Sequence, residues 1–315
     1  MNYDNPKICF VIVWYGTLPD YFQMFANSIL GKPFHILFIS SNPKPQYVPD
    51  NFKWVKMEWN TLMGHFENKL NTPIKIYSSY KLCDFKPAFG HIFSDYLALY
   101  EFWGCLDIDM VIGNIANYLT EERLDNLDFF SGLKYYVAGS FFFMRNTPAH
   151  NKLFMKSRSW QEVMARSDMV SFTECNKYWH QLNSGANLLS LNTPIESFTE
   201  VLLREKELGM GLYFENIVLE PKGMEAVAIK ENGIFYQNRE YLLLHLLYFK
   251  TRQKFTCNIR HNISPYYINA FGTFRRKPDG FGFWLAPNWI VALYRKIIIQ
   301  WEKLFPPRII SENAT

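Results

Sequence analysis

Residues 7–16, KICFVIVWYG, decide the fold: an apolar run rich in Val and Ile ends at a glycine. A continuous run of this kind is typical of a strand buried on both faces of a parallel sheet. Helical spacing follows over residues 20–30, and a second apolar run, residues 35–39, closes at the turn signal SNPKP. Strand, helix and strand in this order predict a doubly wound α/β fold. Its ligands bind at the carboxyl ends of the strands, which makes Tyr15 and Gly16 candidate nucleotide contacts.

Further elements continue this pattern along the chain. Residues 52–57 read as a third strand, and Asn60 caps a helix predicted over residues 61–70. The remaining expected elements are a helical segment over 86–100, a buried strand at 102–106, strands at 129–132 and 139–145, a helix at 148–157 capped by Asn146 or Thr147, and short strands at 214–219, 226–229 and 234–236. The sequence therefore predicts a mixed sheet flanked by helices.

Composition excludes several classes of protein. The 315 residues carry 33 basic and 29 acidic side chains, a balance that argues against a nucleic-acid partner. The five cysteines are widely spaced without a CxxC pair, which argues against a disulfide framework or a zinc site and fits a reducing cytosol. The start of the sequence does not read as a signal peptide, and no apolar stretch reaches about 18 residues. We therefore expect a cytoplasmic protein.

The strongest chemical signal is Asp107-Ile108-Asp109, which follows the predicted strand at 102–106. Alternation along an extended segment would point both carboxylates to the same side. Two such carboxylates form an oxygen-rich site for Mg²⁺ or Mn²⁺, and the metal can neutralise charge on a departing diphosphate. The alternative is a solvated turn in which Asp107 is a cap.

Residues 83–115, CDFKPAFGHIFSDYLALYEFWGCLDIDMVIGNI, resemble a bacterial family of capsule and O-antigen glycosyltransferases. That family is similar to other DXD sugar transferases of the GT-A fold. The resemblance rests on three motifs: Asp84-Phe85-Lys86-Pro87, Phe102-Trp103-Gly104 and Asp107-Ile108-Asp109. It extends over roughly residues 7–255, patchily in the middle. It implies a GT-A-like domain over residues 1–272, with a nucleotide-binding half at about 1–115 and an acceptor half at about 116–272.

The activity implied by this resemblance is the transfer of a sugar from a nucleotide sugar, with a UDP-sugar as the expected donor, to a glycan or lipid-linked glycan in surface polysaccharide synthesis. Asp107 and Asp109 would contact the metal and the donor, and His245 would be a third metal ligand. An imidazole ligand favours Mn²⁺ over Mg²⁺. Lys86 would approach the diphosphate and Tyr15 the uracil ring. Each of the last three residues also has a plain alternative: a core histidine, a solvent-facing lysine and a core aromatic.

Other positions are less well defined. Lys250 and Arg252 would neutralise phosphates if the chain turns back after His245, although a solvated basic loop is the simpler expectation. The family pattern has a Ser-Gly-His segment where this chain has Ala138-Gly139-Ser140, so acceptor binding at Gly139 and Ser140 is expected to differ.

The search for a catalytic base finds only Glu174 after Phe172. Glu174 is therefore assigned, with Asp109, to catalysis. An acceptor hydroxyl that attacks with inversion needs such a base, whereas front-face attack with retention does not. Because the sequence offers few carboxylates that could be this base, it slightly favours a reaction that retains the anomeric configuration.

The C-terminal part of the sequence predicts a linker followed by an amphipathic helix. Residues 273–280, TFRRKPDG, read as a linker, and residues 287–305 form an amphipathic helix with basic side chains outside its apolar stripe. This helix would pack on the domain, or lie on the inner face of the membrane with Trp289 and Trp301 at the interface.

Two functions remain as alternatives to sugar transfer. The same carboxylates would serve a metal-dependent phosphoryl or nucleotidyl transferase. A non-catalytic protein that binds nucleotide or carbohydrate would keep the fold and lose turnover.

Overall fold

The computed structural model describes residues 6–222, 225–231, 233–251, 255–257 and 265–274. The amphipathic helix expected at 287–305 and Arg252 lie outside these residues, as does the predicted linker from residue 275 onward. No helix in the described part of the chain is both long and apolar enough to pass through a bilayer.

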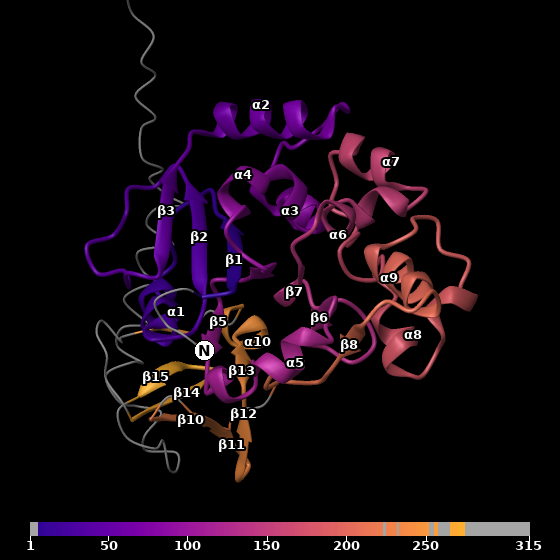
Figure 1. The fold of residues 1–315 in the computed structure, drawn as a ribbon. Helices are drawn as coiled ribbons and strands as arrows, with labels where there is room; N and C mark the ends of the chain where they lie inside the picture. The colour runs from indigo at the N-terminus through magenta and orange to yellow at the C-terminus, as the bar shows by residue number, and fades with distance from the viewer. Residues whose placement is uncertain (1–5, 223–224, 232, 252–254, 258–264, 275–315) are drawn as a thin grey trace, which may run out of the picture.

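A seven-stranded mixed sheet forms the centre of the fold (Figure 1). Its order is β3-β2-β1-β4-β7-β6-β8, with β3, β2, β1 and β4 parallel, β7 antiparallel to both neighbours, and β8 parallel to β6. The strands are β1 (Ile8–Val13), β2 (His35–Ser40), β3 (Phe52–Lys56), β4 (Phe102–Leu106), β6 (Phe129–Ser131), β7 (Phe141–Arg145) and β8 (Leu212–Phe214). The expectation of an α/β fold with a mixed sheet flanked by helices is confirmed.

The chain runs outward from β1 through β2 to β3 and then returns to place β4 on the other side of β1. The strand order therefore reverses between β1 and β4. In open α/β sheets the carboxyl ends of the two strands at such a reversal border a crevice where ligands bind. The loops after β1 and β4 meet at this point.

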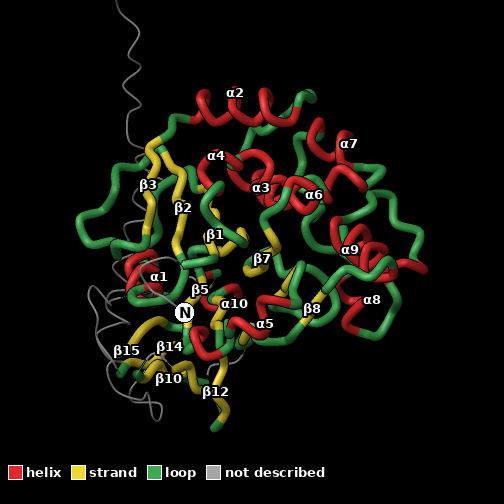
Figure 2. Tube along the Cα trace, viewed as in Figure 1, coloured by secondary structure: helices red, strands yellow, loops and turns green. Residues whose placement is uncertain are grey.

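Alternation along β1 explains how helices cover both faces of the sheet. Cys9 and Val11 pack into a core with Leu62 and Phe66 of α2, whereas Phe10 packs on the other face with Phe25 of α1. Figure 2 shows the helices gathered around the strands. The helices and 3₁₀ helices are α1 (Phe22–Ile29), α2 (Trp59–Leu70), η1 (Ser79–Ala88), α3 (Phe89–Ile92), α4 (Ser94–Leu97), η2 (Ile115–Asn117), α5 (Glu121–Asp125), α6 (Pro148–Asn151), η3 (Leu153–Lys156), α7 (Trp160–Ala165), α8 (Trp179–Asn183), η4 (Leu188–Ser190), α9 (Phe198–Glu207) and α10 (Leu247–Lys250).

Two smaller sheets lie below the main sheet in Figure 1. They contain β5 (Met110–Ile112), β9 (Val218–Leu219) and β13 (Leu243–His245) in one, and β10 (Val227–Lys230), β11 (Gly233–Tyr236), β12 (Arg239–Tyr241), β14 (Tyr266–Asn269) and β15 (Gly272–Phe274) in the other. Strand β15 crosses the expected boundary at residue 272, so Thr273 and Phe274 belong to a sheet. The main sheet takes strands from both expected halves, because β6, β7 and β8 follow residue 116.

Some helix predictions were wrong in detail. The helical segment expected over residues 86–100 is the end of η1 followed by the short helices α3 and α4. Pro87 lies inside η1, where it lacks an N–H and disfavours an α conformation at the residue before it. Asn60 does not cap α2, because the helix already begins at Trp59. Thr147 caps α6, as one of the two predicted choices.

Candidate functional site

Asp107 and Asp109 lie in a tight turn between β4 and β5. The turn begins where the Asp107 N–H donates to the carbonyl oxygen of Ser140 at 3.0 Å, and the side chain of Ile108 is buried. The expectation of an extended Asp-Ile-Asp segment was wrong, because Ile108 and Asp109 form the turn that starts β5. The expected convergence of the two carboxylates is nevertheless present, since the turn brings them together.

His245 joins these carboxylates through the pairing of two short strands. It lies at the end of β13, directly opposite Met110 of β5. Its Nε2 atom is 3.1 Å from Oδ2 of Asp109, although the two residues are 136 positions apart. Ligand atoms of Asp107, Asp109 and His245 all lie within 4.8 Å of one another.

This set of donors fits a divalent metal ion. Two carboxylates and an imidazole suit Mn²⁺ and related ions. His245 is also oriented as metal-binding histidines usually are: its Nδ1 atom is 2.7 Å from Oε1 of Glu220, so Nε2 faces the aspartates. Asp109 and His245 are buried and Asp107 is partly exposed, which leaves one side of the cluster open.

Two lysines contact the same carboxylates. Lys86 donates from Nζ to Oδ1 of Asp107 at 2.6 Å and to the carbonyl oxygen of Gly139 at 2.6 Å. Lys250, in the first turn after β13, donates to Oδ2 of Asp109. The expectation of a solvated basic loop was wrong for Lys250, because α10 turns the chain back over the aspartates.

The charges of these groups stabilise one another. Burial opposes ionisation of Asp109, but His245 and Lys250 outweigh it and hold the pKa of that carboxyl well below its usual range. Burial also opposes protonation of His245, yet the hydrogen bonds of Asp109 and Glu220 raise its pKa to about 9. Burial would lower the pKa of Lys86, but the negative charge of Asp107 outweighs this effect and raises the pKa. Without a metal ion, negative and positive charges therefore alternate in the cluster at neutral pH, and metal binding would require His245 to release its proton.

A cavity of about 320 Å³, here called the strand-end cavity, opens beside this cluster. Its walls include residues 11–15 at the end of β1, residues 106–109 at the end of β4 and just after it, part of η1, and Lys250. It thus lies at the point where the strand order reverses, and its volume is within the usual range for ligand sites.

Tyr15 lines this cavity, and Gly16 lies one residue beyond its wall. The Tyr15 hydroxyl donates to the carbonyl oxygen of Met57 at 2.7 Å, and its ring meets Trp59 edge to face. Gly16 has a φ of 124°, which favours glycine, and its carbonyl oxygen accepts from the Asn42 side chain at 2.8 Å. Gly16 therefore shapes the loop that presents Tyr15.

The motif Asp84-Phe85-Lys86-Pro87 divides into a structural and a site-facing part. Asp84 is fully buried, with Lys81 Nζ at 2.8 Å. Its two oxygens accept from the backbone N–H groups of Val170 at 2.9 Å and Phe172 at 2.8 Å. Asp84 thus fixes the loop that leads to Glu174, while Lys86 faces the cluster.

The motif Phe102-Trp103-Gly104 serves packing. Trp103 is fully buried and donates from Nε1 to the Asn151 side chain at 2.6 Å. A methyl group at Gly90 would lie 2.1 Å from the Trp103 ring, and one at Gly104 would lie 2.2 Å from the Phe142 carbonyl oxygen. This motif positions β4 rather than a ligand.

Glu174 lies in the same region, near enough to Lys86 and Asp107 for their charges to act on it. It is partly buried, and its Oε2 accepts from the Trp179 indole at 2.7 Å. Burial raises the pKa of Glu174, against the opposing effects of Trp179 and Lys86. A Cβ atom at Gly139 would lie 2.8 Å from its Oε1, so glycine leaves room for the carboxylate. Ser140 is buried and contributes its carbonyl oxygen to Asp107.

The structure brings most of the predicted residues to one site: Tyr15, Lys86, Asp107, Asp109, Gly139, Glu174 and His245. Two contributors were missed. Glu220 follows the short strand β9 as a carboxylate after an apolar pair, a weak form of the signal that revealed Asp107. Tyr80, on η1, lines the strand-end cavity with 64% of its surface exposed, and no sequence signal marked it.

Comparison with known proteins gives a family without a described activity. No curated protein matches the chain. The profile of a family of unknown function, DUF6625, matches residues 10–277, which include every residue of the site described above. Because the match covers most of the sequence, the chain belongs to the DUF6625 family.

Proposed function

We propose that this protein is a metal-dependent glycosyltransferase with a GT-A-like fold. In this proposal it moves a sugar from a nucleotide sugar, with UDP-sugars the first candidates, to a glycan or lipid-linked glycan. The observation that carries the proposal is the convergence of Asp107, Asp109 and His245 beside the strand-end cavity. A nucleotide site at the reversal of strand order, with metal-binding side chains at its edge, suits a donor that carries a diphosphate.

The chain's own residues have clear roles in this proposal. Asp107, Asp109 and His245 would hold Mn²⁺ or Mg²⁺, which supplies neutralising charge to the donor's diphosphate. Lys86 and Lys250 already lie against the aspartates, and both would turn to phosphate oxygens when a donor binds. Tyr15 would lie against the base at the mouth of the cavity.

Glu174 is the candidate base for the acceptor hydroxyl. It is close enough to Lys86 and Asp107 for their charges to affect its ionisation, and its raised pKa increases its basicity. A carboxylate in this place supports inversion, which replaces the slight preference for retention that the sequence suggested. Gly139 leaves the space that Glu174 occupies.

The test is a panel of nucleotide sugars assayed for nucleoside diphosphate release with and without Mn²⁺. We expect release from one donor, dependent on Mn²⁺ and lowered at least about 100-fold by Asp107→Asn, since charge stabilisation of a leaving group is commonly worth that much. Asp95→Asn is the matched control, because Asp95 is an exposed aspartate paired with Lys69.

The other outcomes would contradict the proposal in different ways. Release of pyrophosphate would favour a nucleotidyl transferase. Binding of UDP without turnover on any donor and acceptor would favour a non-catalytic binding protein. Absence of nucleotide binding would contradict the proposal that the donor is a nucleotide sugar.

A peripheral membrane contact through residues 287–305 is part of the proposal for a lipid-linked acceptor. The amphipathic sequence with Trp289 and Trp301 supports it. Flotation with anionic liposomes should carry the full chain and not a chain ending at residue 279. Equal flotation of the two would count against the contact.

A further inference from the structure

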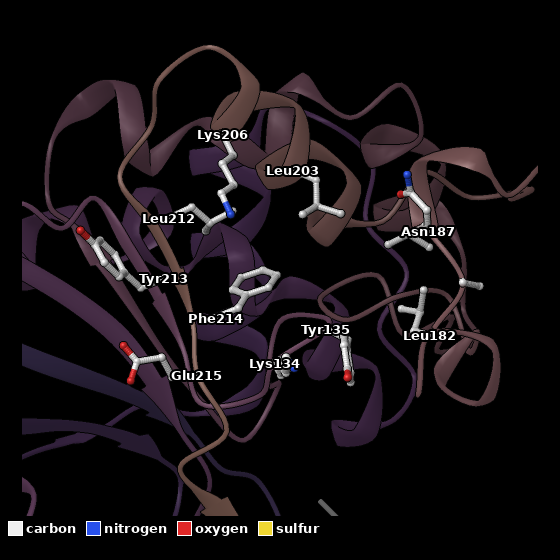
Figure 3. A pocket seen from close by; sticks show the side chains of 12 residues that line it. Lys134, Tyr135, Leu182, Asn187, Leu203, Lys206, Leu212, Tyr213, Phe214 and Glu215 are labelled. Atoms are coloured by element: carbon white, nitrogen blue, oxygen red, sulfur yellow. The ribbon is translucent and has the colours of Figure 1, made fainter. Parts of the chain in front are cut away.

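A second cavity, of about 430 Å³, lies at the free edge of the main sheet. We call it the edge cavity. Its walls come from β8, α9, the segment from α8 to η4, and residues 134–135 after β6. Figure 3 shows Phe214 of β8 in the middle of the labelled side chains, between Lys206 of α9 and the segment with Lys134 and Tyr135.

The charge available in the edge cavity is positive. Lys134 and Lys206 are both exposed, and within the described part of the chain neither forms an ion pair with a carboxylate. The acidic residue of the cavity, Glu215, is already engaged: Oε1 accepts from Arg123 at 2.9 Å and Oε2 accepts from the Tyr118 hydroxyl. A ligand would therefore meet two unneutralised lysines, which favours an anion.

The rest of the lining combines aromatic rings with apolar side chains. Tyr135 is 44% exposed, although its ring carries the ammonium of Lys134 at 5.2 Å. Phe214 and Leu203 are both partly exposed and add apolar surface to the lining. Flat rings beside polar groups suit a ligand with an apolar face and a polar rim, which describes a sugar ring.

Two chain segments connect the edge cavity to the proposed catalytic centre. From Tyr135 the chain runs four residues to Gly139, so their Cα atoms lie at most about 14 Å apart. On the other side, Trp179 donates to Glu174 and begins α8, whose Leu182 lines the cavity. Tyr136 packs against the small buried cluster that contains Cys175 and Leu182. A short oligosaccharide bound in the edge cavity could thus extend to Glu174.

We propose that the edge cavity binds an acidic sugar of the acceptor glycan, a few residues away from the hydroxyl that receives the transferred sugar. This inference rests on the proposed function and names the class of its acceptor: an oligosaccharide that carries carboxylate groups. Lys134 and Lys206 bind the carboxylates, and Tyr135 and Phe214 contact the ring faces.

The experiment measures direct binding by calorimetry, without donor and without metal. The probes are galacturonate oligomers of two to four residues and neutral malto-oligosaccharides of equal length. We expect the galacturonate tetramer to bind more tightly than maltotetraose. A Lys134→Gln/Lys206→Gln double variant should weaken acidic binding about three- to tenfold, because ion pairs between solvent-exposed groups are individually weak. Lys152→Gln, an exposed lysine away from the cavity, is the matched control.

Any of three results would overturn the inference. These are equal binding of acidic and neutral oligomers, acidic binding that the double variant leaves unchanged, and no binding of the acidic oligomers at millimolar concentration. Binding of anionic lipid vesicles that depends on the two lysines, without glycan binding, would assign the cavity to a lipid instead.

The proposed function fails separately from this inference. Asp107→Asn lies at the metal cluster and should leave calorimetric binding of the glycan unchanged. If no donor is turned over and the lysine-dependent glycan binding persists, the glycosyltransferase proposal is at fault and the glycan site stands. If turnover is found without such binding, the glycan site alone is wrong.

Discussion

Two lysine–aspartate pairs begin in the same 3₁₀ helix, η1, and have opposite surroundings. Lys81 and Asp84 are 2.8 Å apart with side chains 1% and 0% exposed. Lys86 and Asp107 are 2.6 Å apart with side chains 12% and 35% exposed. The first pair is closed: backbone groups of residues 168, 170 and 172 complete its hydrogen bonds. The second borders the strand-end cavity.

The difference separates support from chemistry within one short motif. The closed pair ties η1 to the loop that carries Glu174, and its partners are fixed by the fold. The open pair, Lys86–Asp107, and the neighbouring Asp109–Lys250 contact can exchange partners. Their carboxylates can bind a metal ion, and their ammonium groups can bind a diphosphate. A buried pair that serves structure and an open pair that serves binding should respond differently to the same substitution.

The largest expected effect on stability is that of Asp84→Asn. Removing one charge of a buried pair leaves the other without compensation, so the free energy of unfolding should fall by about 3–5 kcal/mol. Asp107→Asn, the same change in the open pair, should cost less than about 1 kcal/mol, because that carboxylate is partly solvated. Urea unfolding of both variants measures this contrast. Equal losses would break the comparison.

Gly139→Ala tests whether the position of Glu174 matters to the reaction. The added methyl group would lie 2.8 Å from Oε1 of Glu174, and Gly139 has no left-handed φ that alanine would strain. The carboxylate must shift, and a displacement of about 1 Å can cost up to about 100-fold in turnover. Steady-state kinetics with the donor identified in the panel measures it. Gly64→Ala is the control, because its methyl group would meet nothing within 4 Å. Unchanged turnover in Gly139→Ala would remove Glu174 from the reaction.

Glu220→Ala tests whether His245 is a metal ligand. Glu220 holds His245 through Nδ1, and loss of such a partner typically lowers metal affinity 10- to 100-fold. Competition with a fluorescent chelator measures the Mn²⁺ affinity. Glu225→Ala, an exposed glutamate hydrogen-bonded to Gln237, should have no effect. Undiminished affinity in Glu220→Ala would mean that His245 is not a ligand.

Lys32 sharpens the comparison, because within the described part of the chain this buried lysine contacts a backbone carbonyl group instead of a carboxylate. It donates to the Gly113 carbonyl oxygen at 2.6 Å, and burial lowers its pKa from 10.5 to about 8. The unfolded chain therefore binds more protons than the folded chain between pH 8 and 10.5, and this lysine makes stability rise with pH across that window.

Lys32→Met should consequently increase the free energy of unfolding by about 1 kcal/mol at pH 7, with the gain shrinking towards pH 10. Denaturant unfolding at the two pH values measures it. Lys44→Met, at an exposed position, should show no such pH dependence. An increase in the free energy of unfolding that stays constant with pH would contradict the lowered pKa of Lys32.

The sequence predicted those features that local pattern determines. The apolar runs that became β1, β2 and β4 were identified because strands buried on both faces are continuously hydrophobic. Asp107 and Asp109 were found because two carboxylates after such a strand are unusual. The turn that joins them was missed, since alternation assumes an extended chain.

Features that depend on distant parts of the chain were harder to predict. His245 came from resemblance alone, because its contact with Asp109 requires the pairing of β5 with β13 across 136 residues. Lys250 was expected in solvent, since nothing local shows that α10 turns back over the site. The roles of Asp84 and Glu220 are to hold other residues, and such support is visible only when both partners are placed.

The most direct test of the account is the binding of Mn²⁺ to the purified protein, followed by electron paramagnetic resonance in the presence of UDP. We expect one ion per chain, an affinity at least about 10-fold lower in Asp107→Asn and in His245→Ala, and no change in Asp95→Asn. No Mn²⁺ binding by the wild-type protein, or equal binding by the site variants, would contradict the claim that Asp107, Asp109 and His245 form a metal centre.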